Sequence, residues 1–517
     1  TATRRRWAKL PYYHHMVRQQ EQVTGPAAVM ATLAMGLGSA VVLGDLRILS
    51  ANISLIRTGL QLSNSMAIIV SSLATLTLAA SVLGAGVLGD RYGMRRMFLA
   101  GASGAVVFGV LGAVAPNVVV LLIARAGIGV AGAFVSALSL AIMNAVFPPD
   151  RRAIAIAWFL AVIYVLGVLP GTAGGLLAER LGWRAGALVT PVLAIIVVAI
   201  TVRYVPETHR SHRGIDVLGL LLVAVALVGV MYGTAELNSG VHPGAIAPLL
   251  VGIIAGTAFL WWESRSDHPA LDLGIFRSQR FTAAVTAGAA NNLVQGGSGI
   301  MIIFYLVVVR DQPTWIVAVL MIPATLLSAL AALGAGRVAA RIGDCAVLVA
   351  GLSVLAVSLL LRLLFGLDTP IVAVGAVMAL MMIGGAIVQT PQTTVMMSSA
   401  PPELGGVVSA VKAAVGSSFN GLGSSLFAMV AIVLSYVDLG PDLAGTGITA
   451  EQAGALLSAG DAAPTGPALD SARTQWVISE VTSSVLEAAD AMNVLMALIA
   501  LGAAAAVLVL FRRTSPH

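Results

Sequence analysis

Long apolar runs separated by short polar segments fill most of this 517-residue chain. A run of about 20 apolar residues is long enough to cross a bilayer as a helix, and only helices satisfy every backbone group within a single span. Fourteen such runs lie near residues 27–50, 64–88, 97–115, 117–143, 152–178, 183–203, 216–235, 245–262, 281–308, 315–338, 345–366, 370–395, 404–435 and 488–511. The pattern predicts an all-α integral membrane protein with about fourteen transmembrane helices.

Composition supports a lipid-facing surface and narrows the function. Only 10% of the residues are charged and the mean hydropathy is +0.95, whereas a soluble domain is about 25% charged. The net charge of +6 would favour nucleic acid as the partner of a soluble protein, but here the arginines lie between the spans, so we expect no nucleic-acid binding. Because the chain has neither a phosphate-binding loop nor a metal-ligand spacing, we expect no enzyme activity, no metal and no cofactor.

Basic residues gather in alternate loops, which orients the spans. Cytoplasmic loops carry an excess of Lys and Arg, so we expect both termini to be cytoplasmic. The loops that fix this orientation contain Arg91, Arg95 and Arg96; Arg151 and Arg152; Arg210 and Arg213; and Arg265, Arg277 and Arg280. Residues 436–487 carry seven acidic residues and one arginine, so we expect a long external loop there, with a short helix near 470–487.

A glycine-framed charged loop follows the second span and has a counterpart in the second half. Gly86-xxx-Asp90-Arg91-x-Gly93 corresponds to Gly336-xxx-Ala340-Arg341-x-Gly343. Internal repeats of this kind are typical of secondary transporters. We therefore expect a basic arm over 1–26, a six-helix bundle over 27–203, two additional helices with flanking loops over 204–280, a second six-helix bundle over 281–511 that includes the external loop, and a cytoplasmic tail over 512–517.

Several strings resemble the major facilitator superfamily, specifically its fourteen-span drug:proton antiporter family (EmrB/QacA type). The loop 86–96 is similar to the superfamily signature G-x-L-a-D-r-x-G-r-k. Arg125–Gly129 is similar to the family's R-x-x-Q-G, and Pro170–Gly175 is similar to its antiporter motif G-P-x-x-G-G. The resemblance implies a major facilitator fold in a bacterial cytoplasmic membrane. It also implies efflux of amphipathic small molecules by alternating access, driven by the proton gradient and carried out by a monomer.

The chain departs from the family pattern at three places. Ile128 replaces the usual Gln, Pro170 and Gly171 stand in inverted order, and Ala340 stands where the first loop has Asp90. The antiporter-like motif of this chain is thus Pro170, Gly171, Gly174 and Gly175. Its glycines allow close helix contact and its proline is expected to kink the span.

The resemblance assigns a gating role to the loop after the second span. Its candidate residues are Gly86, Asp90, Arg91, Gly93, Arg95 and Arg96. We expect charge pairs and helix-end contacts there to hold the two bundles together on the cytoplasmic side. Because Ala340 has replaced the acid of the second copy, this latch should depend mainly on the first copy. The alternative is a loop of arginines that serves topology alone.

Asp45 is the main candidate for proton coupling. It lies deep in the first span, and charged residues within spans are costly and therefore functional by default. The alternative is a solvated acid at a helix end. The family resemblance adds Arg125 of the fourth span, which is able to pair with Asp45 across the bundle or to bond backbone carbonyls instead.

Candidates for the substrate cavity are sparse and mostly positive or neutral. They are Arg47, Asn291, Gln295, Gln389 and Lys412. Each has an alternative reading, because long cationic side chains reach towards head groups and amides bond between helices.

Three functions remain open at this stage. The first is a proton-coupled exporter of drugs, antibiotics or biocides. The second is an exporter or flipper of an anionic or lipidic product, such as an envelope lipid or a secondary metabolite, because cations outnumber acids within the spans. The third is a transport-inactive membrane scaffold, suggested by the altered second loop and the inverted Pro170-Gly171.

Overall fold

The computed structural model describes residues 25–148, 151–208, 210, 214–237, 242–266, 269–310, 312–401, 404–443 and 471–512. All regular structure in these ranges is helical, as the apolar runs predict. Thirteen of the described helices are long and apolar enough to cross a membrane. They correspond to all the expected spans except 404–435, which is helical and lies within α17 (Gly405–Leu443).

The first ten helices run from residue 26 to residue 263. Their bounds are α3 (Pro26–Leu60), α4 (Asn64–Tyr92), α5 (Met94–Ala113), α6 (Val118–Val146), α7 (Arg152–Leu166), α8 (Leu169–Leu181), α9 (Trp183–Ala187), α10 (Val189–Tyr204), α11 (Val217–Glu236) and α12 (Pro243–Glu263). The expected span 152–178 is therefore broken into α7 and α8. Pro170 lies in the first turn of α8, where its missing N–H is tolerated.

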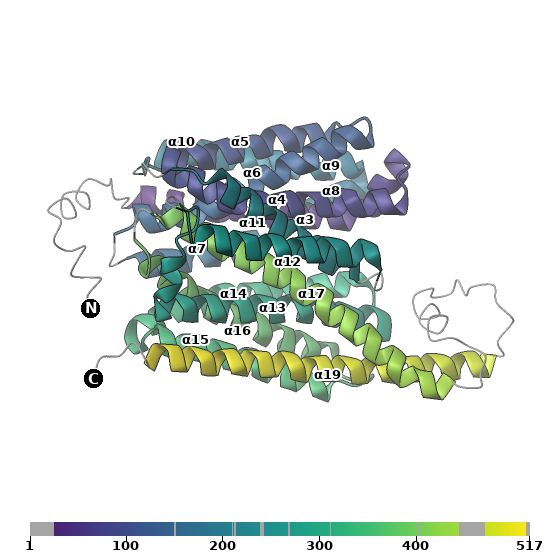
Figure 1. Ribbon diagram of the computed structural model, residues 1–517. Helices are drawn as coiled ribbons and strands as arrows, with labels where there is room; N and C mark the ends of the chain where they lie inside the picture. The colour runs from purple at the N-terminus through teal and green to yellow at the C-terminus, as the bar shows by residue number, and fades with distance from the viewer. Residues whose placement is uncertain are drawn as a thin grey trace. The chain divides into compact units, whose positions relative to one another are not determined.

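The remaining helices belong to the second half of the chain. They are α13 (Gln279–Ile303), the π-helical η3 (Phe304–Val309), α14 (Thr314–Ile342), α15 (Asp344–Leu361), α16 (Ile371–Ser398), α17 (Gly405–Leu443) and α19 (Ser471–Arg512), with the short 3₁₀ helices η2 (Leu273–Arg277) and η4 (Arg362–Leu364). Figure 1 shows α15 and α19 lying side by side.

The helices around the long acidic loop extend further than the apolar pattern predicts. Helix continues to Leu443 in α17 and begins again at Ser471 in α19. The short helix expected near 470–487 is thus the first part of a continuous 42-residue helix. Polar residues such as Glu480 and Glu487 are good helix formers, which explains the extent of α19, whereas α17 continues through Gly440 and Pro441. Residues 444–470 lie outside the described ranges.

The chain divides into two compact units. Unit 1 contains Thr1–Val228, Ile254–Phe281 and Thr393–Ala414. Its interior is built by α3, α4, α5, α6 and α10, with Met35, Phe98 and Leu138 fully buried. Glycines allow these helices to approach closely. A side chain on Gly129 of α6 would overlap the backbone of Ala74 on α4.

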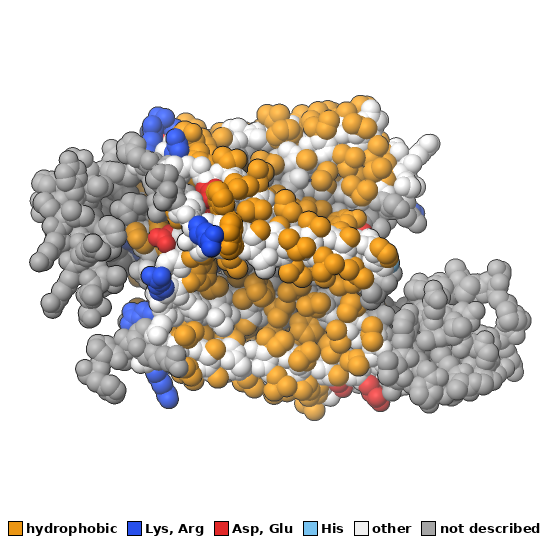
Figure 2. Space-filling view, viewed as in Figure 1, with side chains coloured by type: hydrophobic (Ala, Val, Ile, Leu, Met, Phe, Trp, Pro, Cys, Tyr) orange, Lys and Arg blue, Asp and Glu red, His pale blue; other side chains and the backbone are white. Residues whose placement is uncertain are grey.

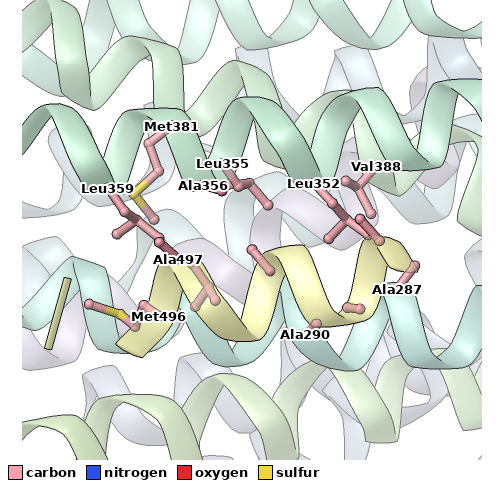
Figure 3. Packing of buried hydrophobic residues seen from close by; sticks show 14 of the residues in the cluster. Ala287, Ala290, Leu352, Leu355, Ala356, Leu359, Met381, Val388, Met496 and Ala497 are labelled. Atoms are coloured by element: carbon pink, nitrogen blue, oxygen red, sulfur yellow. The ribbon is translucent and has the colours of Figure 1, made fainter. Parts of the chain in front are cut away.

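Unit 2 contains Gly229–Ile253, Thr282–Gln392 and Val415–His517. Its apolar core joins α13, α15, α16 and α19. In Figure 3, Leu352, Leu355 and Leu359 of α15 point towards α19, which contributes Met496 and Ala497. Alanines on α13 and α19 keep these helices close to the leucines.

The outer faces of the helices are apolar, which is the reverse of a water-soluble surface. Large hydrophobic side chains are well exposed, including Val107, Leu181, Ile254 and Leu330. In the face shown by Figure 2, hydrophobic side chains cover the middle of the helices, and Lys and Arg side chains gather near the helix ends. This distribution suits contact with a hydrocarbon layer.

Asp216 joins the two additional helices at one end. Its carboxylate accepts hydrogen bonds from Gly219 N (2.9 Å) at the start of α11 and from Trp262 Nε1 (2.8 Å) at the end of α12. Glu263 accepts from Leu271 N (3.2 Å). The Asp-x-x-Gly string at 216–219 thus serves as an N-terminal cap and as a link between helices.

Candidate functional site

Asp45 lies at the centre of a buried polar cluster in unit 1. Its carboxylate accepts one hydrogen bond from Arg125 Nη1 (2.5 Å) through Oδ2 and another from Thr190 Oγ1 (2.8 Å) through Oδ1. Asp45, Arg125 and Thr190 are 6%, 3% and 2% exposed. Three helices, α3, α6 and α10, therefore supply one ion pair and one neutral donor. The sequence-based expectation that Asp45 and Arg125 meet matches this geometry.

Close packing of α3 against α7 and α8 sets the position of Asp45. Its neighbour Gly44 has no side chain, and Pro170 occupies the space where one would stand. One turn further along, Ile48 fills the corresponding space over Gly174. The antiporter-like motif therefore packs directly against the helical segment that presents Asp45.

Arg47 points to a different partner from Asp45. Its Nη1 donates to Gly167 O (3.3 Å), at the break between α7 and α8. Pro170 has no N–H, and the break leaves carbonyls without their helical donors. Arg47 thus satisfies one of them, and its Cβ lies beside Gly171. Gly175 has open space around it.

The loop at 86–96 makes two groups of helix-end contacts, and the first involves Asp90. Asp90 Oδ1 accepts from Gly406 N (2.7 Å) and its Oδ2 accepts from Val407 N (3.0 Å). These are the first backbone donors of α17, where a carboxylate is stabilised by unsatisfied N–H groups and the helix dipole. Gly86 and Gly406 permit this approach, because a side chain on either would collide with the other's backbone.

The second group fastens the start of α5 to the segment after α10. Gly93 turns the chain with a φ of 104°, which favours glycine. Met94 N donates to Thr208 Oγ1 (2.9 Å) and Arg95 N donates to Glu207 Oε1 (3.2 Å). Arg95 Nη2 donates to Val202 O (2.8 Å), and Arg96 forms an ion pair with Glu207 (3.3 Å). Arg91 lies over the Tyr92 ring.

The polar cavity candidates of unit 2 lie on contacting helices. Asn291 and Gln295 are one turn apart on α13, and both face Gly385 of α16, where a side chain would overlap the Gln295 amide. Asn291 is fully buried, and neither of its side-chain polar atoms has a hydrogen-bond partner in the described chain. Gln389 lies one turn beyond Gly385 and is partly buried.

Lys412 belongs to unit 1 and lies on α17, less than two turns beyond the donors to Asp90. Its side chain is partly buried and makes no hydrogen bond or ion pair within the described residues. On the second copy of the charged loop, Gly343 turns with a φ of 91°, as Gly93 does, and Ala340 is exposed.

Three contributors to these sites went unpredicted. Thr190 completes the partners of Asp45, while Glu207 and Thr208 cap α5. Nothing in the string Pro206-Glu207-Thr208 indicates what it contacts. Thr190 could not be singled out as a partner of Asp45 from the sequence, because it is one hydroxyl residue within an apolar span.

We expect substitution of Arg125 alone to be more harmful to stability than removal of the whole pair. Arg125→Gln leaves the buried Asp45 with Thr190 as its remaining partner, and breaking a buried pair costs about 3–5 kcal/mol. Combining Arg125→Gln with Asp45→Asn should recover most of the loss in a thermal unfolding assay in detergent. A double variant as unstable as the single one would contradict this view of the pair.

Thr190 offers a finer test of how Asp45 is held. Thr190→Val removes the donor to Oδ1 at nearly constant volume and leaves a buried carboxylate atom unsatisfied, which costs about 1–3 kcal/mol. We expect Thr190→Val to lower transport several-fold at normal protein level, and Thr190→Ser to retain it. Equal activity of both variants would show that the hydroxyl has no part in positioning Asp45.

These features together define a polytopic, transporter-like fold. The protein has many membrane helices, a buried acid–arginine pair between its first and fourth spans, and a capped helix at its charged loop. The sequence profile described as Major Facilitator Superfamily matches residues 35–428. The chain belongs to this superfamily of membrane transporters, and the expected fold class is confirmed.

Characterised relatives cover most of the chain. It is 28% identical over 445 residues to the multidrug efflux pump LfrA of Mycolicibacterium smegmatis, covering 85% of this chain and 87% of that protein. It is 29% identical over 420 residues to the multidrug resistance protein Stp of Mycobacterium tuberculosis, covering 78% and 77%. The fold is similar to the proton:xylose symporter XylE, with a TM-score of 0.56, 15% identity and coverage of 91% and 94%.

Proposed function

We propose that this protein is a proton-coupled exporter of amphipathic small molecules, such as drugs and antibiotics. The observation that carries the proposal is the buried Asp45–Arg125 pair, 2.5 Å apart and joined by Thr190. An isolated ion pair within a span is expensive to bury, so its presence favours a functional role. Relatives named as multidrug efflux and resistance proteins support the class of cargo.

The coupling follows from simple electrostatics. When Asp45 is ionised it holds Arg125 and, with it, α3 against α6. When Asp45 takes up a proton, the ion pair is lost and Arg125 must find other acceptors. Protonation therefore biases the equilibrium between two helix arrangements, and a cargo that binds one arrangement better is moved at the expense of the proton gradient.

Sidedness and location are part of the proposal. Arginines in alternate loops support cytoplasmic termini, which puts the Asp90 and Gly93 contacts on the cytoplasmic side and Asp45 nearer the external side. A bacterial cytoplasmic membrane supplies the proton gradient. We propose a monomer as the working unit, which the resemblance to the major facilitator superfamily implies.

Transport in everted vesicles tests this function directly. Vesicles that contain the protein and are acidified inside by respiration should accumulate ethidium, and a protonophore should release it. Vesicles from the same cells without the protein provide the baseline. Ethidium accumulation that survives the protonophore, or that never exceeds the baseline, would remove support for proton-coupled export.

A second candidate is export of an anionic or lipidic product, and one observation favours it. Arg362 in unit 2 is 4% exposed, and its guanidinium reaches Ser298 O (3.4 Å) and Met381 Sδ (3.4 Å) with no carboxylate partner in the described residues. A buried cation without an acid suits a negatively charged cargo. Strong resistance to quaternary cations such as ethidium would count against this candidate, whereas export of anionic amphiphiles alone would favour it.

A further inference from the structure

A small cavity lies beside the Asp45–Arg125 pair, inside unit 1, and three polar side chains face it among mostly apolar residues. Its volume is about 30 Å³, and it is lined by residues of α3, α5, α6 and α9, among them Asp45, Asn52, Arg125 and Trp183. A cavity of this size accommodates about two water molecules if polar groups are present to bind them. Small residues such as Gly109 and Gly112 on α5 help to leave the space open.

The polar groups around this cavity need partners that the protein does not supply. Arg125 Nε and Nη2 are buried and donate to no acceptor within the described chain. Buried guanidinium N–H groups without acceptors are costly, and bridging water is the usual way to satisfy such groups. Asn52 donates to Ile48 O (2.8 Å), which leaves its side-chain carbonyl as an acceptor for the same water.

The two sides of Asp45 along α3 differ sharply. Towards the start of α3 the interior is filled by Met35 and Phe98, both fully buried, and Gly38 is in close contact with the Phe98 ring. Towards the end of α3 lie Asn52 and then Ile56, about 10 and 16 Å beyond Asp45 along the helix. The cavity therefore extends from Asp45 towards the end of the unit at which α3 ends and α6 begins.

An apolar cluster closes that end. Leu49, Ile56, Leu121 and Trp183 are buried together with Val70 and Ala115. Trp183 comes closest to α3 at Gly59, where a side chain would stand 2.7 Å from the indole nitrogen. On its other face lies the exposed Arg184, whose guanidinium is 4.4 Å from the Trp183 ring centre and donates to Ala115 O (3.0 Å).

We propose that this cavity is a water site through which the coupling proton passes between the external side and Asp45, and that Trp183 is its external gate. The site takes water and hydronium, and it lies within the amino-terminal helices. The proton thus has its own route to Asp45 from the external end. The proposal rests on proton coupling and on the orientation given above.

Thiol chemistry tests the water route without any need for transport. Cys345 is the only cysteine of the chain, so Cys345→Ser gives a cysteine-free background. In that background Asn52→Cys places a thiol at the cavity, and Leu43→Cys, which is 44% exposed on the outer face within the first span, is the matched control. Silver ions added to the external side of sealed vesicles bind thiols that water reaches, and later maleimide labelling measures what remains free.

We expect silver to protect Asn52→Cys at least tenfold faster than Leu43→Cys, and adding Trp183→Ala to raise the rate at Asn52→Cys several-fold further. Equal rates at both cysteines, no effect of Trp183→Ala, or protection from the cytoplasmic side alone would overturn the proposal. Loss of ethidium transport by the wild-type protein would instead refute proton-coupled export, whatever the silver result. Trp183→Phe serves as a second variant, which should leave the silver rate nearly unchanged if the aromatic ring closes the cavity.

Discussion

Asp45→Asn is expected to abolish proton-driven ethidium accumulation in everted vesicles, with a loss of at least a hundredfold in initial rate. The amide keeps the shape of the side chain, and its single oxygen can accept from Arg125 while its NH2 group donates to the Thr190 hydroxyl. It cannot, however, bind or release a proton near neutral pH. Uptake should therefore lose its dependence on the pH gradient while the protein is still inserted in the membrane.

The matched control for this substitution is Asp368→Asn, at an exposed acid. This variant should accumulate ethidium at the wild-type rate and to the same level. Comparable protein amounts in the membrane are checked by immunoblotting. Undiminished, gradient-dependent uptake in Asp45→Asn would remove Asp45 from the coupling mechanism.

Asp90→Ala is expected to have the second largest effect, this time on conformation. It deletes two hydrogen bonds from the start of α17 to a carboxylate, each worth about 1.5–3 kcal/mol, and leaves Gly406 N and Val407 N without that acceptor. The arrangement in which α4 holds α17 should lose at least about 3 kcal/mol, which corresponds to a population change of about a hundredfold.

Spin labels measure this change directly. Cysteines introduced at the exposed Tyr92 and Ser398, in the Cys345→Ser background, report the distance between the end of α4 and the end of α16. Asp90→Ala should broaden the distance distribution or shift it to longer values. Arg341→Ala, on the second copy of the loop where Ala340 has replaced the acid, should leave it unchanged. A narrow, unshifted distribution in Asp90→Ala would mean that Asp90 is not a latch.

The fold was accessible from the sequence because lipid imposes a simple rule. A run of about 20 apolar residues has few structures other than a spanning helix, and thirteen expected spans correspond to helices that are apolar enough to cross a membrane. The C-terminal end of α17 and the N-terminal end of α19 were harder to predict from the sequence. Residues 436–443 contain Gly440 and Pro441, which usually end a helix, yet α17 continues through them. Residues 471–487 were expected to form a short separate helix, but they are the first part of α19.

The Asp45–Arg125 pair was predictable because charges are rare within spans, so few partners exist for a buried acid. Thr190 was not predictable, because threonines in spans usually bond to their own helix. Thr32, Thr77 and Thr234 each donate to the carbonyl four residues earlier. Only the packing of α10 against α3 distinguishes Thr190 from these residues.

The candidate residues of the substrate cavity could be found in the sequence, but their contacts could not be predicted from it. An amide in an apolar span indicates a polar contact but not its nature, so the sequence could not tell a cavity lining from a helix contact. In the structure Asn291 and Gln295 both face Gly385 of α16. Arg47, expected near the cargo, instead donates to Gly167 O, because a residue two positions from Asp45 lies on another helical face.

If the Asp45–Arg125 pair exchanges a proton against cargo, cargo binding should release a proton from Asp45, and this release can be measured. Purified protein in weakly buffered detergent solution, with a pH indicator dye, is mixed with ethidium. We expect stoichiometric release of protons by the wild-type protein and none by Asp45→Asn, although ethidium binding itself is retained. Release from Asp45→Asn at the wild-type level would contradict this expectation.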